Sequence, residues 1–261
     1  MLNAIIRLPT VVEYFESIII HHLNTIMRSR RFLFSAILLF AALGAVRAET
    51  VDEIINKHID AIGGAVNWRK IAGVKMQGTS TSQGMDINMS FSVSHLKGFR
   101  MDISLMGMTG YEIVTPNGGW YFMPFQGQKQ AEAMTPDDVK ESQDQLDIQG
   151  KLLDYKQKGS TAELVGKEDV EGTECYKIKL TLKSGKVITE FIDPSSYYLI
   201  REVQKMKANG QEREQIVNFS NFQKLPEGIV VPMTLSSGMG DVTVKKVEVN
   251  PKFDDSTFKA G

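Results

Sequence analysis

Strict alternation of apolar and polar side chains is the feature that most constrains how this chain can fold. From residue 85 to 94 every second residue is apolar and every residue between is polar, and the same period covers residues 99–105 and 177–183. Successive side chains of a β-strand point to opposite faces, so a period of two predicts strands with one apolar and one solvated face. Such strands are typical of an antiparallel sheet that is covered on one side only.

Turn-forming residues separate the alternating segments and favour short hairpins between them. The spacing predicts about ten or eleven strands, five before a helical insertion and five or six after it. A sheet of that size with a single apolar face has to curl or split. Residues 49–261 are therefore predicted to form a single domain of mainly β structure with helices (α+β), built on a curled antiparallel sheet. The expected turns are Asn117-Gly118-Gly119, Ser184-Gly185-Lys186, Asn209-Gly210 and Pro226-Glu227-Gly228.

An amino-terminal helix is predicted just after residue 49. Thr50 and Glu53 have the spacing of a capping box, in which each residue bonds the backbone N–H of the other. Apolar residues then recur at helical spacing from Ile54 to Ile62. Gly63-Gly64 is expected to end this amphipathic helix, whose apolar side needs a sheet to lie on.

A second helical segment is predicted in the middle of the chain. Thr135 precedes a proline and two aspartates, a favoured start for a helix. This helix is expected to run to about Ile148 and to pause at Gly150. It is expected to resume through Leu152, Leu153 and Tyr155.

The first 48 residues have the pattern of a targeting segment. A short basic stretch begins at Met27, an apolar run follows it, and small side chains stand at Val46 and Ala48. These parts describe a secretory signal peptide, so we expect residues 27–48 to be removed by cleavage after Ala48 and the protein to be periplasmic. An uncleaved membrane anchor is the alternative, although the run is short for a span. Residues 1–26 match no targeting class and are interpreted as a mis-assigned upstream extension.

Several classes of function find no support in the sequence. The 30 basic and 31 acidic residues nearly balance, so no nucleic-acid partner is expected. Beyond residue 48 the histidines are His58 and His95, and no zinc, nucleotide or hydrolase motif occurs, so we expect no metal and no cofactor. Cys175 is the single cysteine, and the sequence places no base beside it. We expect a non-enzymatic protein in which Cys175 packs as a small structural residue.

Methionine is the residue that the chain uses in excess. Eleven of its 13 methionines lie after residue 48, several of them on the apolar face of the first strands. Because methionine is flexible and polarisable, such a face suits variable apolar partners, and an ordinary core that uses methionine is the alternative. Helices that only partly plug a curled sheet would leave an apolar hollow. The predicted residues of this apolar cavity are Met89, Phe91, Met101, Ile103, Trp120 and Phe122.

One stretch carries a resemblance to a known family. From Val93 to Phe125 two strands are followed by a Gly-x-Trp-x-x-x-Pro-Phe pattern that begins at Gly118. This stretch resembles the LolA/LolB-like lipoprotein-localisation family of periplasmic proteins. A weaker likeness covers residues 49–261, including Ile62-Gly63-Gly64 and the closing segment from Asn250. The resemblance implies an open half-barrel with helices as a lid over an apolar cavity.

One position departs from the family pattern. Members of the family carry an Arg-Pro pair whose arginine latches the lid, whereas this chain has His95-Leu96. His95 is the candidate lid latch by analogy, and a weaker one, because imidazole is mostly neutral near pH 7. The resemblance therefore implies the fold and the binding of apolar ligands, and it does not extend to the cargo of the family.

Three hypotheses about function follow. The leading one is a soluble periplasmic carrier or binder of lipid acyl chains or lipoproteins in outer-membrane lipoprotein sorting, with outer- or inner-membrane envelope proteins as further candidate partners. The alternative is a periplasmic sensor or protein-interaction module of the same fold. The third is a hydrolase built around Cys175.

Overall fold

The computed structural model of the protein describes residues 49–260, with the exception of residues 83, 209, 210 and 239. The expected signal peptide, its cleavage after Ala48 and the expected upstream extension lie outside the described residues. In the described part of the chain, no helix has both the length and the apolar character needed to cross a membrane.

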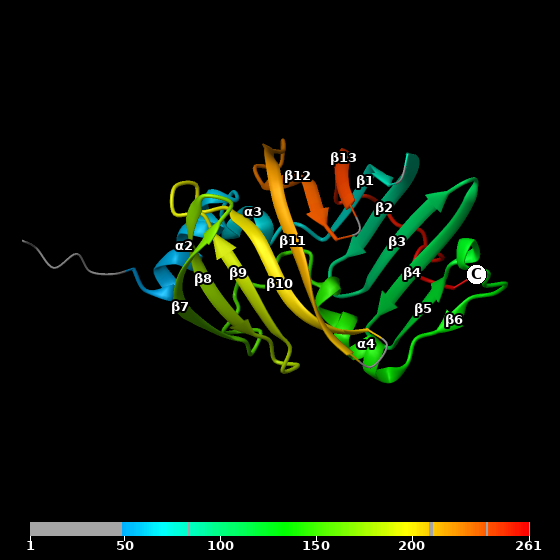
Figure 1. The fold of residues 1–261 in the computed structure, drawn as a ribbon, viewed down its shortest axis with the longest axis horizontal. Coiled ribbons are helices and arrows are strands. Elements are labelled where there is room, and N and C mark those ends of the chain that lie inside the picture. The colour runs from blue at the N-terminus through cyan, green and yellow to red at the C-terminus, as the bar shows by residue number, and fades with distance from the viewer. Residues whose placement is uncertain (1–48, 83, 209–210, 239, 261) are drawn as a thin grey trace, which may run out of the picture. The chain divides into compact units, whose positions relative to one another are not determined.

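The described chain is built on one antiparallel sheet of 13 strands. Its strands are β1 (Gly73–Ser82), β2 (Met85–Ser94), β3 (Gly98–Leu105), β4 (Met108–Thr115), β5 (Gly118–Phe122), β6 (Glu132–Ala133), β7 (Thr161–Val170), β8 (Thr173–Thr181), β9 (Val187–Ile192), β10 (Leu199–Ala208), β11 (Gln211–Lys224), β12 (Val230–Ser237) and β13 (Gly240–Val249). The strands follow one another from edge to edge in the order β6-β5-β4-β3-β2-β1-β13-β12-β11-β10-β9-β8-β7, which Figure 1 shows from right to left. The edge strands β6 and β7 are not paired with each other, so the sheet is not closed into a barrel.

The open half-barrel with few helices is confirmed, and the predicted number of strands is too low. Six strands precede the mid-chain helical segment and seven follow it. β6 has only two residues, too few to show any period in the sequence. β1 and β13 are the one adjacent pair that is distant in sequence, and their pairing joins the two hairpin series into a single sheet.

The first helix, α2 (Val51–Ala61), begins and ends as predicted. The backbone N–H of Thr50 donates to Glu53 Oε2 at 2.7 Å, and the N–H of Glu53 donates to Thr50 Oγ1 at 3.3 Å, so the capping box is present. After the helix, Gly63 takes a φ of +112°, and a Cβ there would lie 2.2 Å from the carbonyl oxygen of Gly228. This close approach allows the chain to turn into the short helix α3 (Ala65–Trp68), which the sequence did not indicate.

The mid-chain segment of residues 135–159, called the insertion below, is less helical than predicted. α4 spans Pro136–Ser142 and the 3-10 helix η2 spans Gln143–Leu146, after which only turns and bends follow. A further 3-10 turn, η1 (Pro124–Gln126), precedes the insertion. The predicted start at Thr135 is confirmed, since its hydroxyl accepts from the backbone N–H of Asp138 at 3.2 Å.

The helical structure ends at Leu146, two residues before its predicted end, and the predicted resumption through Leu152, Leu153 and Tyr155 is wrong. Gly150 and Asp154 have φ angles of +91° and +54°, which lie outside the right-handed helical region. The three apolar side chains that suggested a helix are buried, but each reaches the core from a turn. Three buried side chains in successive turns therefore have the same spacing in the sequence as the apolar side of one helical turn.

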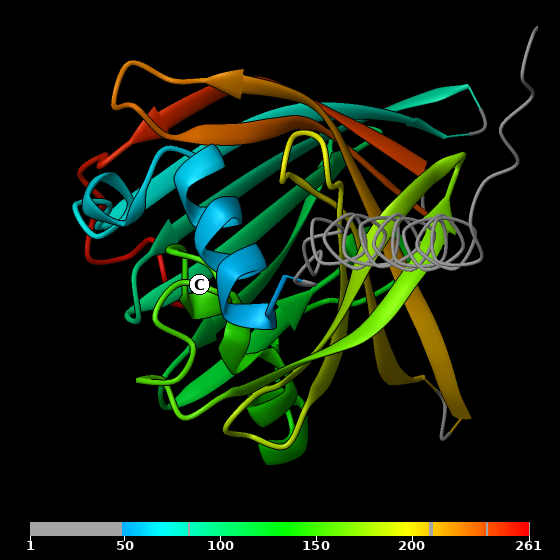
Figure 2. The ribbon, with the colours of Figure 1, turned by 90° about the vertical axis from the view of Figure 1, so that its left-hand side faces the viewer.

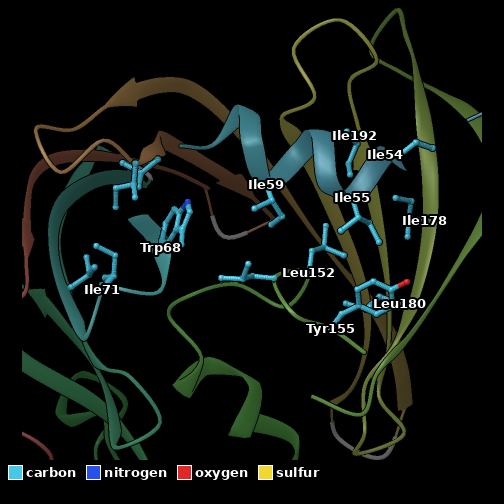
Figure 3. Close-up of a cluster of buried hydrophobic side chains, with 14 residues drawn as sticks. Ile54, Ile55, Ile59, Trp68, Ile71, Leu152, Tyr155, Ile178, Leu180 and Ile192 are labelled. Carbon is cyan, nitrogen blue, oxygen red and sulfur yellow. The ribbon is translucent and has the colours of Figure 1, made fainter. Parts of the chain in front are cut away.

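The main core lies between α2, the insertion and the sheet. The buried isoleucines of α2 meet Leu152 and Tyr155 from the insertion and fully buried residues of β8 and β9, and Figure 3 shows these side chains converging. Complete burial of a side chain of this size contributes about 1.5–3 kcal/mol to folding. The members from α2, β8 and β9 are Ile54, Ile55, Ile59, Ile178, Leu180 and Ile192.

The register divides the side chains of the sheet between two faces. Directly paired residues share a face, and the face called concave below carries Val74, Val231 and Ile178, which pack in the core under α2. Figure 2 shows the strands curving around the space that α2 occupies. The opposite, convex face of the first strands carries Ser92, Arg100 and their neighbours.

The carboxyl-terminal segment covers part of the convex face. Arg100 Nη1 donates to the carbonyl oxygen of Thr257 at 3.2 Å. The rings of Phe253 and Phe258 meet edge to face with centroids 5.3 Å apart, and a Cβ at Gly98 would collide with Phe258. The convex face is therefore the outer face of the half-barrel, and a ligand space has to be sought on the concave side.

Candidate functional site

A hollow of about 310 Å³ lies between α2, the insertion and the strands β9 to β12. Its apolar lining includes Ile59 of α2, Trp68 of α3, Leu152 and Leu153 of the insertion and Val231 of β12. Acidic and basic side chains of the insertion, β9 and β10 complete it on one side, which we call the polar end. The hollow is thus an apolar space with a single charged wall.

Polar contacts fix the turns of the insertion and attach it to the end of α3. Lys158 Nζ donates to Asp147 Oδ2 at 2.5 Å, and the N–H of Gln149 donates to Asp147 Oδ1 at 3.2 Å. Arg69 holds Asp154 with two bonds, of 2.9 Å from Nε and 2.7 Å from Nη2. These contacts fix the turns on either side of Leu152 and Leu153, so both leucines point into the core from an otherwise irregular segment.

Lys151 organises the polar end. Its Nζ donates to Glu202 Oε2 of β10 at 2.8 Å and lies 3.9 Å from Asp144 Oδ2. The other oxygen of Asp144, Oδ1, accepts a hydrogen bond from Lys186 Nζ at 3.0 Å. Burial alone would lower the pKa of Lys151, but the facing carboxylates of Glu202, Asp144 and Glu190 outweigh burial and raise this pKa to about 12. Lys151 therefore stays charged inside the molecule.

Glu190 differs from the other acids of the polar end. Its side chain comes from β9 directly opposite Glu202 on β10, and only 2% of the residue is exposed. Its Oε2 makes no hydrogen bond within the described residues. Burial, with a smaller contribution from the charge of Glu202 and against the attraction of Lys151, raises the pKa of Glu190 to about 8. The carboxyl group is therefore mostly protonated at pH 7 and faces the hollow.

Sequence reasoning missed the polar end, although one signal was available. Ile188, Glu190 and Ile192 stand on the same face of β9, and both isoleucines are fully buried. A carboxyl group at an inward position between two buried isoleucines is costly and calls for an explanation. The six residues of β9 do not alternate strictly between apolar and polar, so the sequence does not show which of its faces points inward.

His58 of α2 also borders the hollow. Its Nδ1 lies 2.8 Å from the carbonyl oxygen of Tyr197, so this nitrogen carries the hydrogen and donates. Burial lowers the pKa of His58, opposed by the bond to Tyr197, so the imidazole is neutral at pH 7. His58 is a structural link between α2 and the turn before β10.

Four of the six predicted ligand residues lie together on the concave face. Met89 pairs with Ile103 and Phe91 pairs with Met101 across β2 and β3, and all four are only half-buried. None of them lines the hollow, which lies at the other half of the sheet. They form a separate half-exposed apolar surface, called the methionine wall below, and their role in binding stays a prediction.

Trp120 and Phe122 lie on the opposite face from these four residues, which corrects their assignment to the same cavity. Trp120 pairs with Ile113, which pairs with Arg100 on the convex face, and Phe122 belongs to the same face. The cause is the sequence of β5, where Trp120, Tyr121 and Phe122 are all aromatic. A run without polar residues has no period from which its inward side can be identified.

His95 lies in the turn between β2 and β3, beside the insertion. Its Nδ1 is 3.5 Å from Asp147 Oδ1, and the N–H of Leu96 donates to the carbonyl oxygen of Leu146 at 2.8 Å. Burial lowers the pKa of His95, and the nearby charge of Lys158 offsets the attraction of Asp147. A neutral imidazole holds the insertion weakly, so the backbone bond of Leu96 is the firmer link, and a latch by His95 stays a prediction.

Cys175 is fully buried at the convex side of β8, in a small cluster with Val170 and Phe191. Burial, together with the charge of Asp193, raises the pKa of its thiol to about 11. A thiol of that pKa supplies almost no thiolate at pH 7, and thiolate is the nucleophilic form. The geometry therefore gives no support to a hydrolase built around Cys175.

Replacing Cys175 by Ser is expected to leave the binding of apolar ligands unchanged and to lower the free energy of unfolding by about 1 kcal/mol. Urea unfolding and titration with a fluorescent fatty acid would measure the two effects. In the wild type, a thiol reagent should react only as the protein unfolds. If an assayable activity disappeared in this variant while the fold was retained, the nucleophile hypothesis would have to be taken up again.

A metal centre is not apparent in the part of the chain that the structure describes. No three histidine, cysteine, aspartate or glutamate side chains there are placed to hold an ion together. Three acids of the polar end, Asp144, Asp147 and Glu202, are instead paired with lysines.

Comparison with known proteins supports the fold. No family model and no curated protein matches the sequence. Among solved structures, the LolA superfamily protein NE2245 from Nitrosomonas europaea is 13% identical with a TM-score of 0.50, over 81% of this chain and 99% of that one. An outer membrane lipoprotein-sorting protein domain from Vibrio parahaemolyticus (described as putative) is 10% identical with a TM-score of 0.48, over 79% and 95%. A DUF1329 family protein from Desulfovibrio piger is 13% identical with a TM-score of 0.49, over 81% and 98%.

The resemblance inferred from the segment Val93 to Phe125 is thereby confirmed for the fold. At 13% identity, the match to the Nitrosomonas protein shows a shared half-barrel and nothing about a shared ligand. Any conclusion about function has to come from the hollow, the methionine wall and the side chains around them.

Proposed function

We propose that this protein is a non-catalytic, exported carrier or binder of lipid acyl chains or lipoproteins in outer-membrane lipoprotein sorting. The hollow under α2 is the observation that supports this most strongly, because an apolar space of about 310 Å³ remains between otherwise packed elements. Ligand pockets are clefts of about 300–1,000 Å³ that are lined mainly by apolar side chains and contain a few polar groups, and the hollow has these properties.

An extended hydrocarbon chain fits the surroundings of the hollow better than a compact polar ligand. Burying one methylene group contributes about 0.8 kcal/mol, so roughly ten methylenes contribute about 8 kcal/mol. That free energy corresponds to a micromolar dissociation constant before the cost of ordering the chain is subtracted. Binding of this strength is sufficient for a carrier that must release its cargo.

The methionine wall extends the apolar concave surface beyond the hollow. Phe91 and Met101 are half-buried, and no described side chain seals them as the core residues are sealed. A second chain of a di- or triacylated lipid would find flexible apolar contacts there. The proposal therefore assigns the first chain to the hollow and further chains to the methionine wall.

Native mass spectrometry of the protein purified from its own envelope tests the proposal. We expect lipid to be retained, and delipidated protein to bind a fluorescent fatty acid that unlabelled acyl chains displace. A stable complex with a partner protein and no lipid would favour a sensor or interaction module. Protein that is free of lipid and does not bind the fluorescent fatty acid would contradict the proposal.

Replacing Ile148 by Trp should weaken fatty-acid binding at least tenfold. Ile148 is half-buried and lines the hollow from the insertion, so a larger ring there occupies ligand space. The matched control is Ile216→Trp on β11, where the side chain is 42% exposed and the change should leave binding as it is. Fluorescence titration of both variants gives the comparison.

The variant Met101→Trp shows whether a single-chain ligand binds in the hollow or on the methionine wall. If the first chain lies in the hollow, a ring on the methionine wall should affect a single-chain ligand by less than about threefold. A stronger effect of Met101→Trp than of Ile148→Trp would place the ligand on the sequence-predicted residues instead.

A further inference from the structure

The polar end of the hollow contains a hydrogen-bond acceptor that nothing in the described structure satisfies. Glu190 Oε2 is buried without a partner, although it lies beside a space large enough for a ligand. Buried polar atoms are nearly always hydrogen-bonded, and leaving one unpaired costs about 1–3 kcal/mol. A group that enters the hollow and donates a hydrogen bond would remove this cost.

The charges around Glu190 indicate which kind of donor is missing. Each neighbouring acid has its own lysine: Lys151 for Glu202, Lys186 for Asp144 and Lys158 for Asp147. His58, which approaches from α2, is neutral, since burial lowers its pKa. Among the described residues, Glu190 alone lines the polar end without an ion pair, so its ionised form lacks one positive charge.

We propose that the hollow takes an apolar chain that ends in a protonated amine, and that Glu190 is the counter-ion and acceptor for this amine. This inference rests on the proposed binding function of the hollow and names the polar group of the ligand. An ammonium group supplies both the missing charge and the missing donor. A carboxylate at the polar end would meet Glu190 and Glu202 and would have to draw Lys151 away from its bond of 2.8 Å, so a fatty acid is expected to enter the hollow with its methyl end first.

Binding of an amine at this place has to displace a proton. Burial raises the pKa of Glu190 to about 8, so roughly nine molecules in ten carry the proton at pH 7. An alkylammonium ion remains protonated up to pH 9, as the ordinary lysine pKa of about 10.4 indicates. The carboxylic proton therefore passes to the buffer when the ion pair forms, and the amine keeps its own.

Isothermal titration calorimetry with decylamine and decanol, two ligands with the same chain, tests the inference. In buffers of different ionisation enthalpy at pH 7, decylamine should release close to one proton per molecule bound, and decanol should release none. Between pH 7 and pH 9 the affinity for decylamine should rise about tenfold, because the ionised fraction of Glu190 rises by that factor. Glu190→Gln should abolish the proton release and the rise of the affinity for decylamine with pH.

The outcomes separate the inference from the proposed function. If decanol and decylamine bind equally well to the wild type and neither releases a proton, the amine site is refuted while the binding of apolar chains stands. If neither ligand binds, the proposed function fails and the inference fails with it. Proton release is measured on the wild type, so a folding defect of Glu190→Gln does not remove the test.

Discussion

Glu190→Gln is expected to stabilise the protein by about 3 kcal/mol at pH 7 and by almost nothing at pH 4. The pKa of Glu190 is raised from 4.5 to about 8 in the folded protein, because burial disfavours the carboxylate. The folded state therefore keeps a proton that the unfolded chain loses above about pH 4.5. Each pH unit between these two values costs about 1.4 kcal/mol of stability, and Gln removes this cost because it does not ionise.

Urea unfolding of wild type and variant at pH 4 and pH 7 measures the effect. The matched control is Glu202→Gln, at the position directly opposite on β10. That change removes the nearest partner of the partly buried Lys151 and should destabilise the protein by about 2 kcal/mol at pH 7. A destabilised Glu190→Gln at pH 7 would mean that Glu190 is ionised and paired in the folded protein, and the same gain at both pH values would mean that its pKa is not raised by folding.

The second large effect is expected for Ile178→Ala, which should lower the free energy of unfolding by about 4 kcal/mol. Ile178 is fully buried under α2, so its removal leaves a cavity in addition to the lost transfer free energy. Phe91→Ala removes a larger side chain, but from the half-exposed methionine wall, and should cost less than about 2 kcal/mol. In a sealed core, Phe→Ala would cost about 3–5 kcal/mol.

The order of the two losses is the informative result, because the smaller side chain is expected to have the larger effect. Urea unfolding of both variants without ligand measures the two losses. A loss for Phe91→Ala as large as that for Ile178→Ala would mean that the methionine wall is an ordinary core surface. The proposal that further acyl chains lie on it would then be withdrawn, while the assignment of the hollow would be unaffected.

The alternation of apolar and polar residues in the strands and the capping residues of the first helix were sufficient to predict much of the half-barrel. The alternation from Met85 to Ser94 predicted β2 and its inward side, and Phe91 and Met101 do pair on the concave face. Thr50 and Glu53 identified the start of α2 to the residue. These signals are local, so they do not depend on what the segment later packs against.

The errors arose where local pattern and tertiary environment disagree. Leu152 and Leu153 have helical spacing but reach the core from turns, because Gly150 and the ion pair of Asp154 with Arg69 set the path of the chain. The inward side of the aromatic strand at Trp120 could not be identified without a period. Such cases depend on contacts between distant segments, which one sequence does not display.

The site was the least predictable part of the molecule. The hollow is lined by segments from α2 to β12, and although the insertion contributes Asp144 and residues 147–153, its other lining residues come from six elements far apart in the sequence. Met89 and Met101 do lie on the concave face, but on β2 and β3, away from the residues that line the hollow. Glu190 and Lys151 lie far apart in the chain and meet only because β9 and the insertion pack together.

The central claim, that the hollow under α2 holds an acyl chain, is tested most directly by a fatty acid that carries a photoreactive diazirine near its methyl end. After irradiation and digestion, mass spectrometry of the labelled peptides locates the chain. We expect the label in the insertion around Ile148 to Leu153 and in β11 and β12 around Phe219 to Val231, which line the hollow. Labelling confined to Met89 to Ile103, or no labelling that excess unlabelled fatty acid suppresses, would contradict the claim.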